Sequence, residues 1–311
     1  MKNFESKQAK RATKAARADL KSKYATRPTI AQDQSETPKA KQSPHMARAE
    51  RTQVLITSGC SFSETLVEET WPIHLHRMLV NETAFCPSQH ISLGLGSQGN
   101  GLISRKVIHA VHEELKVKEA EDILVGIMWS SPSRHEQYSC DRDEILRLKH
   151  GSNKDQWMDN PTSVVEKDVA GGWILYNSHW TIPQAKNYYR NVYNETYSMI
   201  QTLEHIIRVQ NYLKVHNVNY CMGVYTGEVL RLHKNVTSEW PGCHVMTEHP
   251  SLVHLYEQID FDQFFDTNGE MEFAKASDLP NLKGDHHPSS DQHKLFCQEV
   301  IIPHLKSKIN I

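Results

Sequence analysis

The sequence has few of the features that mark exported, membrane-spanning or disulfide-stabilised proteins. No apolar run among its 311 residues approaches the roughly 18 residues that a membrane-spanning helix needs. Residues 1–21 are basic, but no apolar stretch follows them, so we expect no secretory signal peptide. The six cysteines are scattered without a C-x-x-C pair, which favours free thiols in a reducing compartment. We therefore expect a cytoplasmic protein without a membrane span.

The formal net charge of −2 conceals two segments of opposite sign. Residues 1–51 carry 13 Lys and Arg against 5 Asp and Glu, a net of +8, whereas the remainder has a net of −10. Within the basic segment, residues 28–51 are polar with three prolines, a composition typical of a linker. We expect a basic arm and polar linker over 1–51, followed by one domain over 52–311.

Short apolar segments alternate with helical patterns along the first half of this domain. Three segments are predicted strands because they are apolar and end at polar or Gly-rich turns: 54–57, the segment starting at His90, and 122–129. Helices are predicted between them, at 71–79 and about 101–119. This alternation is typical of a parallel α/β sheet, and we expect a three-layer α/β/α sandwich of the flavodoxin-like kind.

The second half of the domain is less regular. Residues 134–186 break the alternation and are interpreted as an insertion or lid. Residues 187–216 predict the longest helix, since a buried stripe recurs every three or four residues at Met199, Ile200, Leu203, Ile206, Ile207 and Leu213. A fourth strand is predicted at 217–225, residues 226–280 remain ambiguous, and a last helix starts near Ser290.

Ser61 lies in the segment Gly-Cys-Ser-Phe-Ser, residues 59–63, directly after the first predicted strand. A small residue lets the backbone turn sharply there and exposes the hydroxyl at a helix N-terminus, where backbone N–H groups can hold an oxyanion. Ligands of open α/β sheets collect at this edge. The pattern is compatible with a nucleophile, and also with a plain turn in which the serine caps a helix.

The segment Asp-His-His-Pro, residues 285–288, directly precedes the last predicted helix. A serine nucleophile needs a base, and the base needs an orienting acid. Asp285 and His287, two residues apart on a loop that proline restricts, could supply both. The same segment could instead cap the helix, form an exposed histidine pair, or hold a metal ion together with Asp291 and His293.

The turn at 96–101 contains three glycines and leads into a helix. It has neither a G-x-G-x-x-G followed by a distant acid nor the lysine of a phosphate-binding loop, which disfavours nucleotide binding. Gly96 and Gly99 could let backbone amides approach a ligand, and the Asn100 side chain could donate a hydrogen bond. Ser130, after the third strand, lies at the same edge and could face a substrate. Alternatively, the glycines only mark a helix start and the serine belongs to a polar loop.

The order of these segments resembles the SGNH/GDSL hydrolase family, and most closely the divergent SGNH-like proteins often encoded by bacteriophages. The shared features are Gly-x-Ser after the first strand, a Gly/Asn turn after the second, Trp-Ser after the third, and Asp-x-His-Pro before the final helix. A long helix containing TLEHIIRVQNYLK adds to the resemblance. It covers roughly residues 52–311 and not the basic arm.

The resemblance implies a role for each residue of the site. Ser61 would be the nucleophile, His287 the general base and Asp285 the acid that orients it. The backbone N–H groups of Ser61 and of Gly96 or Gly99 would line the oxyanion hole. No metal and no other cofactor is implied.

The sequence departs from the family pattern at three places. Cys60 stands where the family has Asp, and the acid and the base are two residues apart rather than the more usual three. The Gly-x-Asn-Asp of the third block is absent, and Gly-Ile-Met-Trp-Ser stands at 126–130 instead. Asn100 or Ser130 could replace the missing donor, whose loss typically costs about 10²–10³ in kcat.

We expect a serine ester hydrolase that cleaves an O-acetyl or other short acyl group from a carbohydrate or lipid. Its substrate would be a small ester or an acylated glycan. If a phage encodes it, we expect it in the host cytoplasm or in the virion. The rival expectation is a non-catalytic structural or binding protein of the same fold, such as a phage particle component anchored by its basic arm.

The arm at residues 1–45 is expected to bind an anionic partner, either a nucleic acid or an acidic protein surface. Deleting residues 1–45 should abolish association with double-stranded DNA at low salt. Binding of the full chain should weaken steeply between low and physiological salt, as measured by a filter-binding titration. Equal binding by the full and shortened chains at low salt would show that the arm is a solvated tail.

Overall fold

The computed structural model describes residues 52–65, 69–139, 172–176, 183–230, 249–266, 268–282 and 287–309. All of them belong to one compact unit, Glu50–Ile311. The basic arm, most of the predicted insertion, and Asp285 lie outside the described residues. The expectations about them therefore stay predictions.

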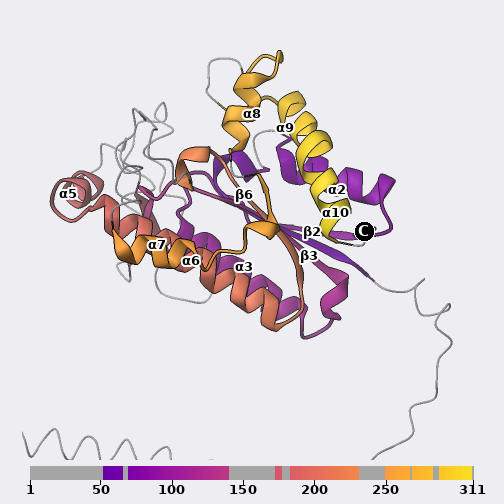
Figure 1. The fold of residues 1–311 in the computed structure, drawn as a ribbon, viewed down its shortest axis with the longest axis horizontal. Helices are drawn as coiled ribbons and strands as arrows, with labels where there is room; N and C mark the ends of the chain where they lie inside the picture. The colour runs from indigo at the N-terminus through magenta and orange to yellow at the C-terminus, as the bar shows by residue number, and fades with distance from the viewer. Residues whose placement is uncertain are drawn as a thin grey trace, which may run out of the picture. The chain divides into compact units, whose positions relative to one another are not determined.

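A five-stranded parallel sheet forms the centre of this unit (Figure 1). In spatial order its strands are β2 (Gln89–Ser92), β1 (Val54–Ser58), β3 (Ile123–Trp129), β6 (Asn219–Val224) and β7 (Phe264–Asp266). Counted along the chain, this is the 2-1-3-4-5 order of the flavodoxin-like fold. The predicted fold class is confirmed.

The strands carry apolar side chains on both faces, and each face has its own core. On β1, Val54 and Ile56 join one buried cluster while Leu55 joins the other. On β3, Val125 belongs to the first cluster and Leu124 to the second. This alternation follows from the two-residue period of a strand, and burial on both faces explains why β3 is apolar throughout.

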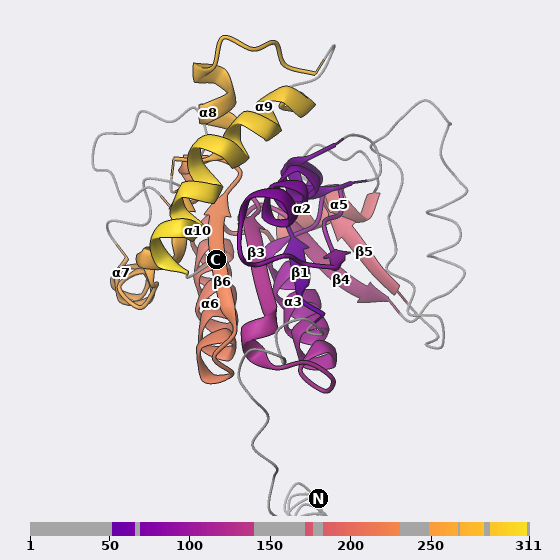
Figure 2. The same ribbon diagram turned by 90° about the vertical axis from the view of Figure 1, so that its right-hand side faces the viewer.

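Helices cover both faces of the sheet and complete three layers, as the two views show (Figures 1 and 2). One layer consists of α3 (Asn100–Glu114), α6 (Glu195–Val215) and α7 (Pro250–Tyr256). The other layer contains α2 (Trp71–Glu82), α9 (Ser290–Phe296) and α10 (Ile302–Lys308), with a π-helical turn η6 (Cys297–Ile301) between the last two. The remaining short elements are η1 (Ser61–Ser63), η2 (Ala120–Asp122), α5 (Pro183–Asn191), η4 (Gly227–Val229), η5 (Phe261–Gln263) and α8 (Glu270–Ala276).

The single helix predicted over 187–216 is wrong, because the chain forms two helices there. The first, α5, ends at Asn191, and α6 begins at Glu195. Asn194 separates them as the N-cap of α6, where its side chain accepts a hydrogen bond from the Tyr197 N–H at 2.9 Å. Asparagine favours such caps because its side chain competes for backbone donors. The predicted buried stripe lies on α6.

The edge strand β7 was not predicted, since it is only three residues long and lies in the ambiguous segment. Its Phe265 packs into the second core, where its ring leaves no room for a side chain at Gly223 of β6. A Cβ on Gly223 would lie 2.1 Å from that ring. The glycine at position 223 of β6 therefore makes room for a neighbouring strand that the local sequence pattern does not predict.

Two further strands form a separate antiparallel ribbon outside the main sheet, β4 (His135–Ser139) and β5 (Gly172–Tyr176). Both belong to the predicted insertion over 134–186. The residues between them lie outside those described, so the predicted lid role stays untested. Within the described residues, no helix is long and apolar enough to cross a lipid bilayer.

Acidification should destabilise the fold through His90 on β2. Burial and the neighbouring His76, whose ring stacks on it at 5.4 Å, lower the pKa of His90 to about 4. The unfolded chain takes up this proton near 6.5, so the stabilisation is complete above that pH and is lost as pH falls toward 4. His90→Gln should reduce the loss of unfolding free energy between pH 7 and 5, measured by urea denaturation. His109→Gln, exposed on α3, is the control and should leave that loss unchanged.

Candidate active site

Steric constraints fix the turn that carries Ser61 directly after β1. A Cβ on Gly59 would lie 2.2 Å from the Ser63 Oγ, and a Cβ on Gly94 would lie 2.1 Å from the Ser63 carbonyl oxygen. The buried Ser63 hydroxyl in turn accepts a hydrogen bond from the Trp71 indole N–H at 2.9 Å. Close backbone packing at Gly59 and Gly94, together with the Trp71 indole, thus holds η1 in place. Ser61 itself is half-buried at the carboxyl-terminal edge of the sheet.

His287 reaches this turn from the other end of the chain. Its Nε2 lies 2.8 Å from the Ser61 Oγ. Its ring packs against Phe62, with centroids 5.0 Å apart. Its carbonyl oxygen accepts a hydrogen bond from the Leu282 N–H at 3.1 Å, and Ser289, two residues later, forms the capping box of α9. The ring of His287 is therefore packed against Phe62, and its backbone is held by hydrogen bonds at His287 and Ser289.

This contact has the geometry of a nucleophile and its base. In the tautomer with Nε2 unprotonated, the Ser61 hydroxyl donates to His287, and the same nitrogen can take the proton when the oxygen attacks. Sequence reasoning named both residues, and the structure brings them together. Asp285, the predicted orienting acid, lies outside the described residues, so its role stays a prediction.

A buried carboxylate near this histidine was missed by sequence reasoning. Glu270, the first residue of α8, is fully buried, and its Oε1 contacts the His293 Nδ1 at 2.5 Å. Burial raises the pKa of Glu270, and the charges of His293 and His287 oppose the shift. The residue lies in the segment 226–280, which the sequence analysis left ambiguous, so no local sequence pattern could have identified it.

The metal alternative receives no support from the described residues. No group of three or more His, Cys, Asp and Glu side chains there is placed to hold a metal ion. His293, one of the proposed ligands, is paired with Glu270 instead. The histidines of α2 also have structural partners: His74 contacts the Ser290 hydroxyl at 3.0 Å, and His76 contacts the Pro87 carbonyl oxygen at 3.0 Å.

The Gly-rich turn after β2 is occupied by carboxylates of the chain itself. The Gly96 N–H donates to the Glu64 Oε2 at 3.0 Å, so this predicted oxyanion donor already has an acceptor. A Cβ on Gly99 would lie 2.3 Å from the Glu136 Oε2. The glycines allow two acidic side chains to approach a helix N-terminus, where the helix dipole favours negative charge. These contacts give the two glycines a structural role.

Asn100 and Ser130 bind each other instead of facing a substrate. The Asn100 Nδ2 donates to the Ser130 carbonyl oxygen at 2.9 Å and to the Thr202 Oγ1 at 3.1 Å. The Asn100 Oδ1 accepts from the Ser130 N–H at 2.7 Å. Both amide hydrogens are used in this buried bridge, and the Ser130 side chain is fully buried. The expectation that either residue supplies the missing oxyanion donor is corrected accordingly.

The backbone N–H of Ser61 is another of the predicted oxyanion donors. It stands at the start of η1, where the first N–H groups of a helix have no acceptor within the helix. Among the residues described, no hydrogen bond from this N–H is recorded. Because it belongs to the nucleophile residue, this N–H lies close to the carbon that the Ser61 oxygen would attack.

Comparison with known proteins finds no matching family model and no matching curated protein. Two solved structures are similar to this chain. One is described as a member of the lipolytic protein G-D-S-L family from Veillonella parvula DSM 2008, with 9% identity, a TM-score of 0.38, and coverage of 83% of this chain and 98% of that one. The other is an acetyl xylan esterase, AlAXEase, with 10% identity, a TM-score of 0.38, and coverage of 82% and 99%. At these values we base the function on this chain's own geometry.

Replacing Asn100 with alanine should destabilise the fold, because the N–H and C=O groups of Ser130 would both lose a buried partner. Each unsatisfied group costs about 1–3 kcal/mol, so the free energy of unfolding should fall by about 2–6 kcal/mol in urea denaturation. Asn191→Ala, which removes an exposed amide contact to Asn187, should change it by less than about 0.5 kcal/mol. An Asn100→Ala protein of unchanged stability would contradict the structural role.

Proposed function

We propose that this protein is a serine ester hydrolase. The observation that carries the proposal is the 2.8 Å contact between the Ser61 Oγ and the His287 Nε2 at the carboxyl-terminal edge of the sheet. The half-buried hydroxyl is accessible, whereas the turn that holds it is rigidly packed. The order of the sequence segments supports a relationship to the SGNH/GDSL hydrolases.

In the first half of the proposed reaction, the Ser61 oxygen attacks the ester carbonyl carbon while its proton passes to the His287 Nε2. The negative charge that develops on the carbonyl oxygen is stabilised by the Ser61 N–H. The tetrahedral intermediate then breaks its bond to the alcohol, which leaves with the proton from His287. An acyl-enzyme on Ser61 remains.

In the second half, water attacks the acyl carbon and gives its proton to the His287 Nε2. The Ser61 oxygen recovers that proton as the acid departs. Asp285 is proposed to orient the imidazole and stabilise its charged form, as the sequence resemblance implies. The substrate class is a short acyl ester, such as an O-acetyl group on a carbohydrate or lipid.

A non-catalytic protein of the same fold is the second candidate. Two predicted oxyanion donors that already have acceptors within the chain favour it. The Gly96 N–H donates to the Glu64 carboxylate, and the Asn100 side chain donates to the buried Ser130 carbonyl oxygen. A site without these two donors would turn over slowly, since one lost donor costs about 10²–10³ in kcat. Direct measurement of ester cleavage separates the two candidates.

Ser61→Ala should lower turnover of p-nitrophenyl acetate by at least about 10³-fold, since no acyl-enzyme can form. His287→Ala should cost nearly as much because the two residues act as a unit. Initial rates test these expectations.

Ser307→Ala, an exposed serine on α10, is the matched control and should keep full turnover. Circular dichroism should show that each variant is folded. A fluorophosphonate probe should label Ser61 and neither Ser63 nor Ser130, as mapped by mass spectrometry. A folded protein that shows no turnover and no labelling would overturn the esterase proposal in favour of the non-catalytic candidate.

A further inference from the structure

The β4–β5 ribbon presents two faces with different tasks. One face is docked onto α3: Glu136 forms an ion pair with Arg105 at 2.9 Å, and the Arg105 guanidinium lies 4.1 Å above the Trp173 ring. The opposite face carries the directly paired residues His135 and Tyr176. Because one face is fixed to the body, the other is held open as a rigid platform.

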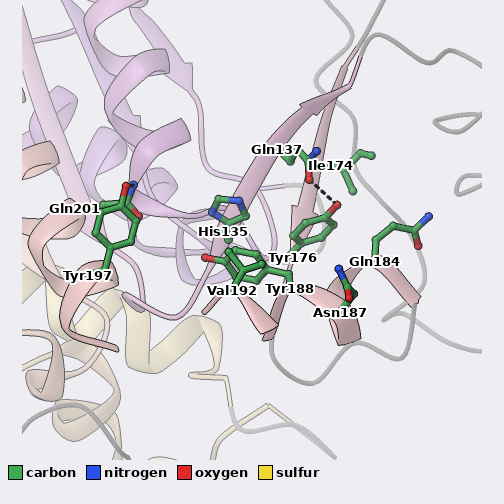
Figure 3. A pocket seen from close by; sticks show the side chains of 10 residues that line it. All are labelled: His135, Gln137, Ile174, Tyr176, Gln184, Asn187, Tyr188, Val192, Tyr197 and Gln201. Carbon is green, nitrogen blue, oxygen red and sulfur yellow. Dashed lines mark hydrogen bonds between the residues drawn. The ribbon is translucent and has the colours of Figure 1, made fainter. Parts of the chain in front are cut away.

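That second face forms the floor of a cavity of about 420 Å³, whose walls come from α5, Val192 and the start of α6 (Figure 3). The volume falls within the roughly 300–1,000 Å³ that small-ligand sites occupy. The cavity is distinct from the Ser61 and His287 contact, since neither residue lines it. Nothing in the hydrolytic reaction requires it.

Aromatic rings make up a large part of the lining. His135 and Tyr188 are stacked with centroids 4.2 Å apart and planes 7° from parallel, and Tyr176 lies 5.8 Å from each. Tyr197 stands at the rim with 56% of its surface exposed. Such rings offer flat apolar surfaces at little conformational cost, combined with hydroxyl groups that can hydrogen-bond.

Apart from Ile174 and Val192, the rest of the lining is polar but uncharged. Side-chain amides of Gln137, Asn187 and Gln201 project from three different elements, and each offers both donors and acceptors. Among the described residues, no Lys, Arg, Asp or Glu lines the cavity. Burial, with the charge of Arg105, lowers the pKa of His135, so its imidazole is neutral at neutral pH. The ligand that fits this lining is itself neutral.

We propose that this cavity binds a neutral saccharide unit. A sugar ring has apolar C–H faces that pack on aromatic rings, and hydroxyl groups around its rim that both donate to and accept from amides. A phosphorylated or carboxylated ligand would find no cation among the described lining residues. A lipid chain would cover the lining amides without hydrogen-bonding to their remaining donors and acceptors.

The cavity is mechanically joined to the candidate active site. The Tyr189 hydroxyl contacts the carbonyl oxygens of Ser133 at 2.6 Å and Tyr176 at 3.0 Å, which ties the cavity wall to the loop that leaves β3. That loop also positions Arg134 over the Tyr225 ring, 5.8 Å from its centroid. If the proposed function holds, the cavity is the place for the sugar part of an acylated glycan. Saccharide binding itself does not rest on that function.

The test is binding of neutral trisaccharides to the full-length Ser61→Ala protein, which cannot consume an ester. Cellotriose, xylotriose and chitotriose are the probes, measured by isothermal titration calorimetry and saturation-transfer NMR. At least one should bind. Tyr197→Ala should weaken that binding about fivefold or more, through loss of a stacking ring at an exposed position that folding does not need.

Tyr138→Ala is the matched control, because Tyr138 is 40% exposed on the same ribbon but pairs with Trp173 on the docked face. It should leave the affinity unchanged. The proposal is overturned if no trisaccharide binds, or if the Tyr138 and Tyr197 variants weaken binding equally. Binding of octanoate or adenosine monophosphate in place of the trisaccharides, lost in Tyr197→Ala, would assign another ligand class and also overturn it.

The two proposals fail separately. Trisaccharide binding to Ser61→Ala together with no ester turnover by the unaltered protein would leave a saccharide-binding protein without esterase activity. Ester turnover without trisaccharide binding would leave an esterase whose cavity has no sugar ligand.

Discussion

Close packing around Trp71 positions both groups of the candidate active site. Its indole N–H holds the Ser63 hydroxyl, and its ring lies 3.2 Å from where a Cβ on Gly126 would stand. Its carbonyl oxygen accepts a hydrogen bond from the Cys297 thiol at 3.3 Å, which joins α2 to the last helical segment. That segment follows His287, so one buried residue, through its indole and its carbonyl group, connects the nucleophile turn to the segment that follows the base.

Electrostatics around the site are arranged largely by the chain's own carboxylates. Glu64 and Glu136 approach the Gly-rich turn, and Glu270 is buried with His293 behind the histidine loop. Burial raises the pKa of Glu136, and the Arg105 guanidinium opposes that shift. Acidic side chains thus stabilise helix termini and histidines internally, and the Ser61 N–H remains as a predicted oxyanion donor at the edge of the sheet.

Local patterns predicted the features that depend on local chemistry. Strands β1 and β3 follow from apolar runs, and Ser61 and His287 follow from short motifs at the ends of elements. The features that were missed depend on contacts across the chain. The Gly96 N–H donates to the Glu64 carboxylate 32 residues away, and the role of Asn100 requires Ser130 and Thr202. Residues of one type can serve a ligand or a neighbour, and only the fold distinguishes these uses.

The sequence distance across the Trp71 layer has a consequence for the order of folding. Cys297 and Trp71 are separated by 226 residues, as are His287 and Ser61. Strands β1, β2 and β3 can pair much earlier during synthesis, but the apolar face of α2, with Leu75 and Leu79, stays uncovered until α9 emerges. The nascent chain therefore exposes this helix face while the residues between α2 and α9 are synthesised, a surface that invites chaperone binding or aggregation before the active pair can form.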